Sequence, residues 1–396
     1  MIIYYIYSKR FCALIIYINS YLFLRNLIYT IIFISLCSCQ SNDDTSSIEL
    51  ERNDEVSIFD LADSISILKL ETNNESLIKG ISKVIPYKNR FYIFDSRSQV
   101  IFCFDSTGNY LFKINRLGRG PEEYERVEDF NINSFNDQLI LLVPWGFILT
   151  FDLDGNFISK TKLPEEVKSY NNVYAINKDT LLFLSSNEYR AVYYSSKNKI
   201  IIDKCLGEDE MPEIGLTTGS VYTYDDSLYF SSVGLNNNVL NMSDPNRRIV
   251  YNWDFGSNNL TKARIRKALK YKLKMIQKRE VFDLTDIFED NRYPTFYRCG
   301  SHETDRFAIT SVLYKVRFGI LCIFKDKISG KVDVFRETKE GIQFSYFSAY
   351  NNYLILYQSY KNKFYSEETL SPKQLEILKS HNPETDNPFL VIYHLK

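Results

Sequence analysis

A six-residue turn motif that occurs twice in this chain limits the folds open to it. Phe104 to Asn109 reads Phe-Asp-Ser-Thr-Gly-Asn and Phe151 to Asn156 reads Phe-Asp-Leu-Asp-Gly-Asn, each between two short runs with β-strand alternation. The spacing from Phe104 to Phe151 is 47 residues, which is typical of a four-stranded propeller blade. Looser versions occur at 195–199 and at 325–331, where Gly330 supplies a residue that can adopt φ > 0. The repeat therefore predicts a β-propeller.

Strand-like alternation divides the body of the chain into six groups of about four strands. One further strand-like run, 64–70, precedes the first group, and we expect it to pair with the final strand, 389–395. A terminal strand that completes the last blade closes the ring and removes an exposed edge. The predicted fold class is all-β, a six-bladed β-propeller with short helical insertions. Its six strand groups cover residues 81–115, 126–163, 170–205, 219–254, 296–336 and 343–395.

The N-terminus has the pattern of a lipoprotein signal peptide. Arg25 precedes an apolar run over 27–36, and Leu36-Cys37-Ser38-Cys39 resembles a lipobox, in which Cys39 becomes the first mature residue and carries diacylglycerol. The alternative is an uncleaved transmembrane helix, which a second apolar stretch over 11–23 favours. Neither stretch alone reaches the roughly 20 residues that span a bilayer, so we predict the lipid anchor.

Three parts follow from this interpretation. The polar tract after Cys39 cannot bury surface and predicts a flexible linker. We expect a signal peptide over 1–38, a flexible tether over 39–60 and the propeller over 61–396. The predicted location is the cell envelope, where lipid anchors the protein to the outer membrane on its periplasmic or its surface side.

Two segments of the chain also resemble a known family. One runs from Phe104-Asp105 through Gly118-Arg119-Gly120-Pro121-Glu122-Glu123-Tyr124 to Asp129-Phe130, and the other is the C-terminal stretch 386–393. Both are similar to the six-bladed β-propeller lipoproteins of the NHL/TolB-like type, a family of domains of unknown function. The resemblance implies the fold and the location, and it carries no assigned catalytic residues.

Charge and cysteine usage exclude several classes of function. Lys and Arg total 48 against 49 Asp and Glu, so the chain has no basic excess, and we expect no nucleic-acid partner. The cysteines show no Cys-x-x-Cys or His-spaced cluster, and the acidic run 208–213 lacks EF-hand spacing, so we expect no metal and no cofactor. Cys103 and Cys322 lie in apolar runs and predict buried thiols without a disulfide framework.

Loop length distinguishes the two faces of the predicted propeller. Loops between the second and third strands of a blade, and links from one blade to the next, share one face, which we name the long-loop face. They contain the long insertions at 206–219, 256–293 and 359–388. Because loops on a rigid scaffold carry binding function, we predict that this face is the working one. The ligand-binding candidates around its mouth are Arg97, Arg119, Trp145, Tyr189, Arg190 and Arg317.

Each candidate has a structural alternative. Aromatic rings stack on sugars and Arg binds carboxylates in a bidentate fork, but Arg119 is also placed to pin one blade to the next, and Trp145 to pack within a turn. Residues 261–279 predict a helix with Thr261 as N-cap and a basic face, which either contacts anionic lipid or glycan or is simply solvated. Residues 371–380 predict a second short helix.

The sequence favours a binding protein over an enzyme. The three histidines, His302, His381 and His394, form no recognisable catalytic set, and no nucleophile elbow, zinc-protease motif or phosphate loop is present. We predict a membrane-anchored binding or scaffold module for a glycan, a peptide or a partner protein. The alternative is a carbohydrate-active hydrolase or lyase, which requires carboxylates such as Glu122 and Glu123, or a His, Tyr and Arg group, to converge in one pocket.

Overall fold

The computed structural model divides the chain into two units, 1–47 and 48–396. No helix within the described part is long and apolar enough to cross a membrane. The structure describes residues 47–185, 188–207, 220–231, 237–259, 261–278, 280, 296–315, 319–344, 347–357 and 364–396.

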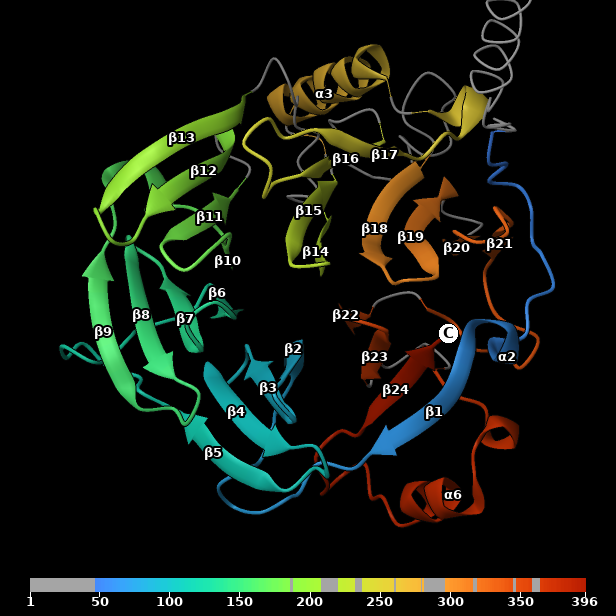
Figure 1. Ribbon diagram of the computed structural model, residues 1–396, viewed down its shortest axis with the longest axis horizontal. Coiled ribbons are helices and arrows are strands. Elements are labelled where there is room, and N and C mark those ends of the chain that lie inside the picture. The colour runs from blue at the N-terminus through green and yellow to red at the C-terminus, as the bar shows by residue number, and fades with distance from the viewer. Residues whose placement is uncertain are drawn as a thin grey trace, which may run out of the picture. The chain divides into compact units, whose positions relative to one another are not determined.

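Six four-stranded antiparallel sheets are arranged around a common axis, which confirms the predicted six-bladed β-propeller (Figure 1). Blades one and two contain β2 (Ile81–Tyr87), β3 (Arg90–Asp95), β4 (Val100–Asp105), β5 (Tyr110–Ile114), β6 (Asp129–Asn133), β7 (Gln138–Val143), β8 (Phe147–Asp152) and β9 (Phe157–Lys162). Blades three and four contain β10 (Asn172–Ala175), β11 (Thr180–Leu184), β12 (Tyr189–Ser195), β13 (Ile200–Gly207), β14 (Ser220–Tyr224), β15 (Ser227–Ser231), β16 (Asn238–Asn241) and β17 (Ile249–Asn252). Blades five and six contain β18 (Phe296–Glu303), β19 (Phe307–Tyr314), β20 (Ile320–Asp326), β21 (Val332–Phe335), β22 (Ser348–Tyr350), β23 (Tyr353–Tyr357), β24 (Leu390–Leu395) and β1 (Ala62–Leu68).

The ring is closed by the two ends of the propeller chain. β1 pairs antiparallel with β24 and forms the outermost strand of blade six, with Ile65 opposite Tyr393 and Ile67 opposite Val391. The expected pairing of 64–70 with 389–395 is confirmed. Closure gives the outer side of β24 a hydrogen-bonding partner from the opposite end of the sequence, so the last blade has the same four strands as the others.

The hydrophobic core consists of six clusters, one between each pair of neighbouring blades. Strand β4 shows how one strand serves two of them. Ile101 and Cys103 pack toward blade two, whereas Val100, Phe102 and Phe104 pack toward blade six. Because both faces of such strands are buried, their sequences are nearly continuous apolar runs. Cys103, Cys205 and Cys322 form no disulfide, and their side chains are buried within these layers.

In blades one and two, the repeated turn motif packs against the preceding blade. Gly108 and Gly155 have φ of +90° and +81°, a region that favours glycine. A Cβ atom at Gly108 would lie 2.1 Å from the carbonyl oxygen of Lys69, which follows β1 in blade six. At Gly155 it would lie 2.6 Å from the ring of Phe112 in blade one. The motif therefore combines a tight turn with a close contact between blades.

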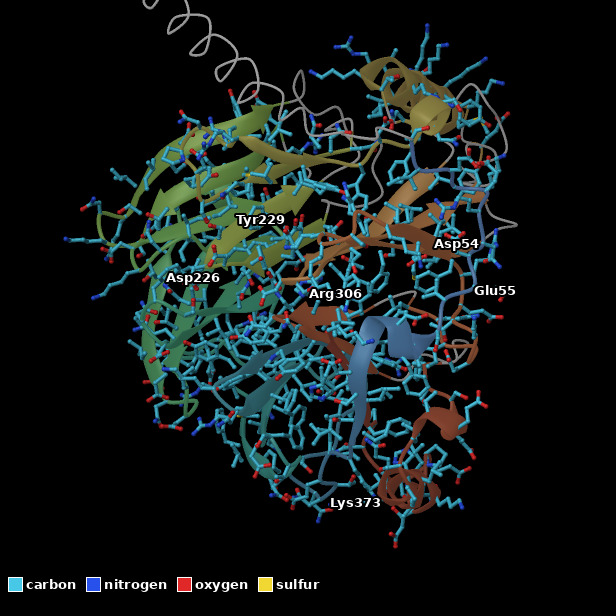
Figure 2. The ribbon with its side chains drawn as sticks, turned by 45° about the vertical axis from the view of Figure 1, so that its right-hand side comes forward. Asp54, Glu55, Asp226, Tyr229, Arg306 and Lys373 are labelled. Atoms are coloured by element: carbon cyan, nitrogen blue, oxygen red, sulfur yellow. The ribbon has the colours of Figure 1, made fainter. Side chains whose placement is uncertain are left out.

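Residues 48–57, which we name the N-terminal strap, cross the outer side of blade five. Asp54 N–H donates to Val334 O at 2.7 Å, and Val334 N–H donates to Asp54 Oδ2 at 2.7 Å, so the strap hydrogen-bonds to the outermost strand β21. Figure 2 shows Asp54 and Glu55 at this position. Ile48 and Leu50 are buried. The strap and the helix α2 (Ile58–Leu61) that follows it thus belong to the folded body, in contrast to the flexible tether that the sequence predicts over 39–60.

Two helices occupy the long insertions where the sequence predicts them. α3 (Lys262–Gln277) begins after Thr261, whose hydroxyl accepts a hydrogen bond from Arg264 N–H. α6 (Pro372–Lys379) begins after Ser371, which forms a capping box with Gln374. Figure 1 shows both helices outside the ring of sheets, α3 beside blade four and α6 beside blade six.

Candidate functional site

Lys83 and Asp129 form an ion pair where the inner strands of blades one and two begin, at the long-loop face. Lys83 Nζ lies 2.8 Å from Asp129 Oδ1 and donates to Phe130 O at 2.7 Å. Asp129 Oδ2 accepts from Val173 N–H on β10 at 3.0 Å. The Asp129 side chain is 6% exposed and that of Lys83 is 27% exposed. Lys83 Nζ also lies 5.6 Å from the ring centroid of Tyr174. The pair therefore joins three consecutive blades and leaves one cation partly accessible.

Polar side chains continue this face from blade two into blade three. Glu128 accepts from Asn171 Nδ2 at 3.2 Å and pairs with Arg126 at 3.1 Å. Ser185 Oγ donates to Asn171 Oδ1 at 3.4 Å. These residues lie in blade-to-blade links and in the loop after β11. Their contacts hold the loops of neighbouring blades in fixed relative positions, as a preorganised binding surface requires.

Trp145 is presented to solvent by the loop between β7 and β8. Its exposed fraction is 76%, and its φ is +72°. A bulky residue with φ > 0 is a genuine outlier among non-glycine residues. The alternative in which Trp145 packs within its turn is wrong, because most of the indole surface faces solvent.

Arg119 lies in the link between β5 and β6, where its side chain is 88% exposed and pairs with Glu125 of the same link. Other residues pin this link. Tyr124 OH donates to Gln99 O in blade one at 2.9 Å, and Lys160 Nζ on β9 donates to Glu123 O at 2.7 Å. Tyr124 and Lys160, and not Arg119, therefore hold this link against the neighbouring blades.

Arg97 is an exposed cation of blade one, in the loop between β3 and β4. The carboxylate of Asp95, which is buried, accepts hydrogen bonds from the backbone N–H groups of Arg97 at 2.9 Å and Ser98 at 3.2 Å and so fixes the loop. The Arg97 side chain crosses Gly80, where an added Cβ would lie 3.0 Å from Arg97 Cδ. Arg97 is thus held at its base.

Tyr189 and Arg190, at the start of β12, differ in exposure. Tyr189 is 38% exposed, and its carbonyl accepts a hydrogen bond from Tyr170 OH at 2.5 Å. Burial raises the pKa of Tyr170 to about 12, so this hydroxyl remains a donor at neutral pH. Arg190 is only 4% exposed, and its backbone carbonyl pairs with Ser185 N–H. Of the two residues, only Tyr189 has surface for a ligand.

The carboxylates of Glu122 and Glu123 serve different partners within one loop. Glu122 Oε2 lies 2.5 Å from Arg116 Nη1, and Glu123 Oε2 accepts from Gly120 N–H at 2.8 Å. They do not supply the converging pair that the hydrolase or lyase alternative requires. Among the residues that the structure describes, no three His, Cys, Asp or Glu side chains gather as metal ligands would.

Several predicted features fall outside the described residues, namely Cys39, Arg317 and the acidic run 208–213. The sequence reasoning also missed a central part of the site. The sequence predicted no role for Lys83, and Asp129 was named only within the segment that resembles a known family. The available signal was a charged residue in each of two inner strands, but 46 positions separate them, so the pairing follows only from the placement of the blades.

Comparisons with known proteins agree with this architecture. The model of a family described as a domain of unknown function (DUF4934) matches residues 45–394. A solved structure from Bacteroides fragilis NCTC 9343, of a protein classed as exported, is similar with a TM-score of 0.66 at 18% identity, covering 87% of this chain and 98% of that one. A member of the DUF4221 family from Bacteroides vulgatus ATCC 8482 has a TM-score of 0.51 at 10% identity, covering 87% of this chain and 99% of that one. No curated protein matches the chain. The two structural likenesses show the fold.

Proposed function

This chain belongs to the DUF4934 family, a domain of unknown function, and we propose that it is a lipid-anchored envelope protein that binds a glycan, a peptide or a partner protein at its long-loop face. The Bacteroides fragilis protein of similar fold is classed as exported, which supports an envelope location. The propeller supports a binding or scaffold role, because its rigid blades hold loops from different parts of the chain on one face.

The observation that carries the binding proposal is the presentation of Trp145. An L-residue in the left-handed region costs roughly 1–2 kcal/mol, and an exposed indole contributes little to the core. Strain and exposure combined in one residue are typical of positions kept for contact with a ligand. Arg97 and Arg119 are exposed cations in neighbouring connections of the same face. An aromatic platform beside cations suits a sugar or a peptide that carries carboxylates.

The binding test uses two equally simple truncations on opposite faces. Soluble envelope glycans and peptides are screened by thermal shift, and the affinity of any binder is then measured for Trp145→Ala and Ile328→Ala. Ile328 is 82% exposed in the turn between β20 and β21, on the face opposite the long-loop face. We expect Trp145→Ala to weaken binding by about 30-fold, as for a central aromatic contact of about 2 kcal/mol, and Ile328→Ala to leave it unchanged. Equal affinities for both variants and the wild type would reject the proposal that the ligand binds at the long-loop face.

The anchor is tested separately. Replacing Cys39 with Ser removes the thiol that would carry diacylglycerol, so the variant should move from the membrane fraction to the soluble fraction of lysed cells. Cys37→Ser, two residues away, is the control and should remain in the membrane fraction. Membrane retention of the Cys39→Ser protein would show that another segment holds it there.

A further inference from the structure

Helix α3 presents an exposed basic surface. Seven of its 16 residues are Lys or Arg and none is acidic, although the whole chain is nearly neutral at −1. Leu273 and Ile276 are 50% and 55% exposed within the same surface. In Figure 2 nitrogen-tipped side chains project from α3 away from the blades. The exposed basic side chains in and next to the helix are Lys262, Arg266, Lys267, Lys270, Lys274 and Lys278.

The charge pattern of α3 opposes the stability of the helix. Arg266, Lys270 and Lys274 are spaced four residues apart and therefore share one face. Like charges at this spacing destabilise a helix, as opposite charges stabilise it. A surface that repels itself gains most from an anionic partner, and Leu273 and Ile276 add apolar area to the contact. This combination is typical of helices that lie on an anionic membrane.

The N-terminal end of the folded body lies at the base of the same helix. Ile48 N–H donates to Asp254 O at 2.7 Å. Ile48 packs in one hydrophobic cluster with Trp253, Phe255 and Ile265, and Ile265 belongs to α3. The strap then leads away from α3 along blade five. The chain that precedes Ile48 therefore joins the body beside α3.

The length of that preceding chain limits the distance to a lipid anchor. From Cys39 to Ser47 the chain advances eight residues, which span at most about 28 Å when fully extended. α3, with 16 residues, is about 24 Å long. A lipid on Cys39 would thus hold α3 within about its own length of the bilayer. Resting on the proposed anchor, we infer that α3 docks on an anionic phospholipid surface, with Leu273 and Ile276 entering the headgroup region.

Docking of α3 orients the propeller. α3 is part of the link that follows blade four, and blade four lies opposite blade one in a ring of six (Figure 1). A membrane contact at α3 turns blades one and two, which carry Arg97 and Trp145, away from the bilayer. The lipid tethers the protein, and the helix determines which side of the ring faces outward.

The test compares charge reversal on two exposed helices. The full chain carrying Cys39→Ser is mixed with vesicles of phosphatidylcholine alone or with added phosphatidylglycerol, and the bound fraction is measured by co-sedimentation. Lys270→Glu/Lys274→Glu alters α3, whereas Lys373→Glu/Lys379→Glu makes the same change on α6, where Figure 2 labels Lys373. The N-terminal residues are identical in all variants. A difference between variants in the binding gained on adding phosphatidylglycerol therefore reports on the altered charges alone. Circular dichroism and thermal unfolding confirm that both variants fold.

We expect phosphatidylglycerol to increase binding in a salt-sensitive manner. The α3 variant should bind at least about 30-fold more weakly, because each of the two lost lysines contributes about 1 kcal/mol and about 1.4 kcal/mol corresponds to a tenfold change in affinity. The α6 variant should match the unaltered chain. Three results would overturn the inference. Vesicle binding would not increase with phosphatidylglycerol, the α3 and α6 variants would lose equal affinity for the vesicles, or the protein would bind a soluble polyanionic glycan and not the vesicles. Retention in cell membranes of a chain that carries Cys39→Ser together with Lys270→Glu/Lys274→Glu would reject the lipid anchor, whereas unchanged vesicle binding of the α3 variant would reject only the docking of α3.

Discussion

The backbone of Gly155 in blade two lies against the ring of Phe112 in blade one, so closely that a Cβ atom would sit 2.6 Å from Phe112 Cε2. The same turn is held from blade one by Arg90 Nη1 and Tyr92 OH, which donate to Leu153 O at 2.7 and 2.9 Å. The turn motif that defines the repeat in the sequence is therefore also an element of the contact between blades.

Gly155→Ala should destabilise the protein more than Gly330→Ala. Both glycines have positive φ, +81° and +75°, so both variants bear a left-handed penalty of about 1 kcal/mol. Only Gly155 adds a clash, because nothing lies within 4 Å of a Cβ at Gly330, and overpacking costs typically about 1–3 kcal/mol. Urea unfolding should show the difference. Equal free energies of unfolding would mean that the turn of blade two moves freely away from Phe112.

Lys83→Met should lower stability far more than Lys88→Met, although both remove a lysine from an ion pair in blade one. The Lys88–Asp137 pair is 56% and 44% exposed, and such pairs contribute about 0–1 kcal/mol. Lys83→Met leaves Asp129 buried without its cation, for which about 3 kcal/mol is expected. Chemical denaturation of both variants gives the comparison, and Lys83→Met/Asp129→Asn should recover part of the loss. A Lys83→Met loss no larger than that of Lys88→Met would contradict the structural role of the pair.

His302 should make stability depend on pH between about 6.5 and 4. It links blades five and six through a 2.7 Å contact of Nε2 with Asn351 O, and burial lowers its pKa to about 4. The unfolded chain, with an ordinary pKa near 6.5, binds the proton first as pH falls. Stability is therefore full above about pH 6.5 and falls toward pH 4, by at most about 3 kcal/mol.

The matched variant for this effect is His302→Gln, which retains a donor toward Asn351. Its free energy of unfolding, measured by urea titration at a series of pH values, should change less between pH 6.5 and 4 than that of the wild type. Hydrogen bonds from the backbone of Ser329 and from Arg306 lower the pKa of Asp326 to about 2. The contribution of Asp326 is therefore lost only below about pH 4, outside the His302 window. Parallel curves of unfolding free energy against pH for the wild type and His302→Gln would contradict the assignment of this pH dependence to His302.

Leu50→Ala tests whether the strap belongs to the folded body. Leu50 is fully buried, whereas Leu77, in the link between blades six and one, is 52% exposed. Truncation of a buried leucine costs about 2–5 kcal/mol, and Leu77→Ala should cost well below this. Thermal or urea unfolding of the two variants provides the measurement. A Leu50→Ala variant as stable as the wild type would mean that the strap detaches in solution.

The fold was predictable from the sequence because its determinants are local or periodic. The repeated turn at Phe104–Asn109 and Phe151–Asn156 indicated the blades. The run 64–70 lies outside the six strand groups, and it therefore predicted a ring in which an N-terminal strand completes the last blade. The strap was not predictable, because Ile48 and Leu50 lie in a polar stretch without strand periodicity. Their places depend on distant parts of the chain: the hydrophobic cluster between blades four and five, and the bonds of Asp54 with β21.

The candidate site was predictable only in part. The sequence predicted that Trp145 lies in a loop of the long-loop face, but it did not distinguish an exposed indole from a packed one. It did not separate Tyr189 from Arg190, since neighbouring strand residues point to opposite faces and the depth of the loop decides which one is buried. The pairing of Lys83 with Asp129 depends on the contact between blades, which no local pattern reports.

The strap also has a mechanical consequence. A pull on the chain ahead of Ile48 acts first on the Ile48 contact with Asp254 and on the bonds between Asp54 and Val334. The strap precedes the closing strand β1 in the chain, so tension reaches β1 only after these contacts have broken. Force applied at the N-terminus would thus be borne by the outside of blade five, and the closure of the ring would be shielded from it.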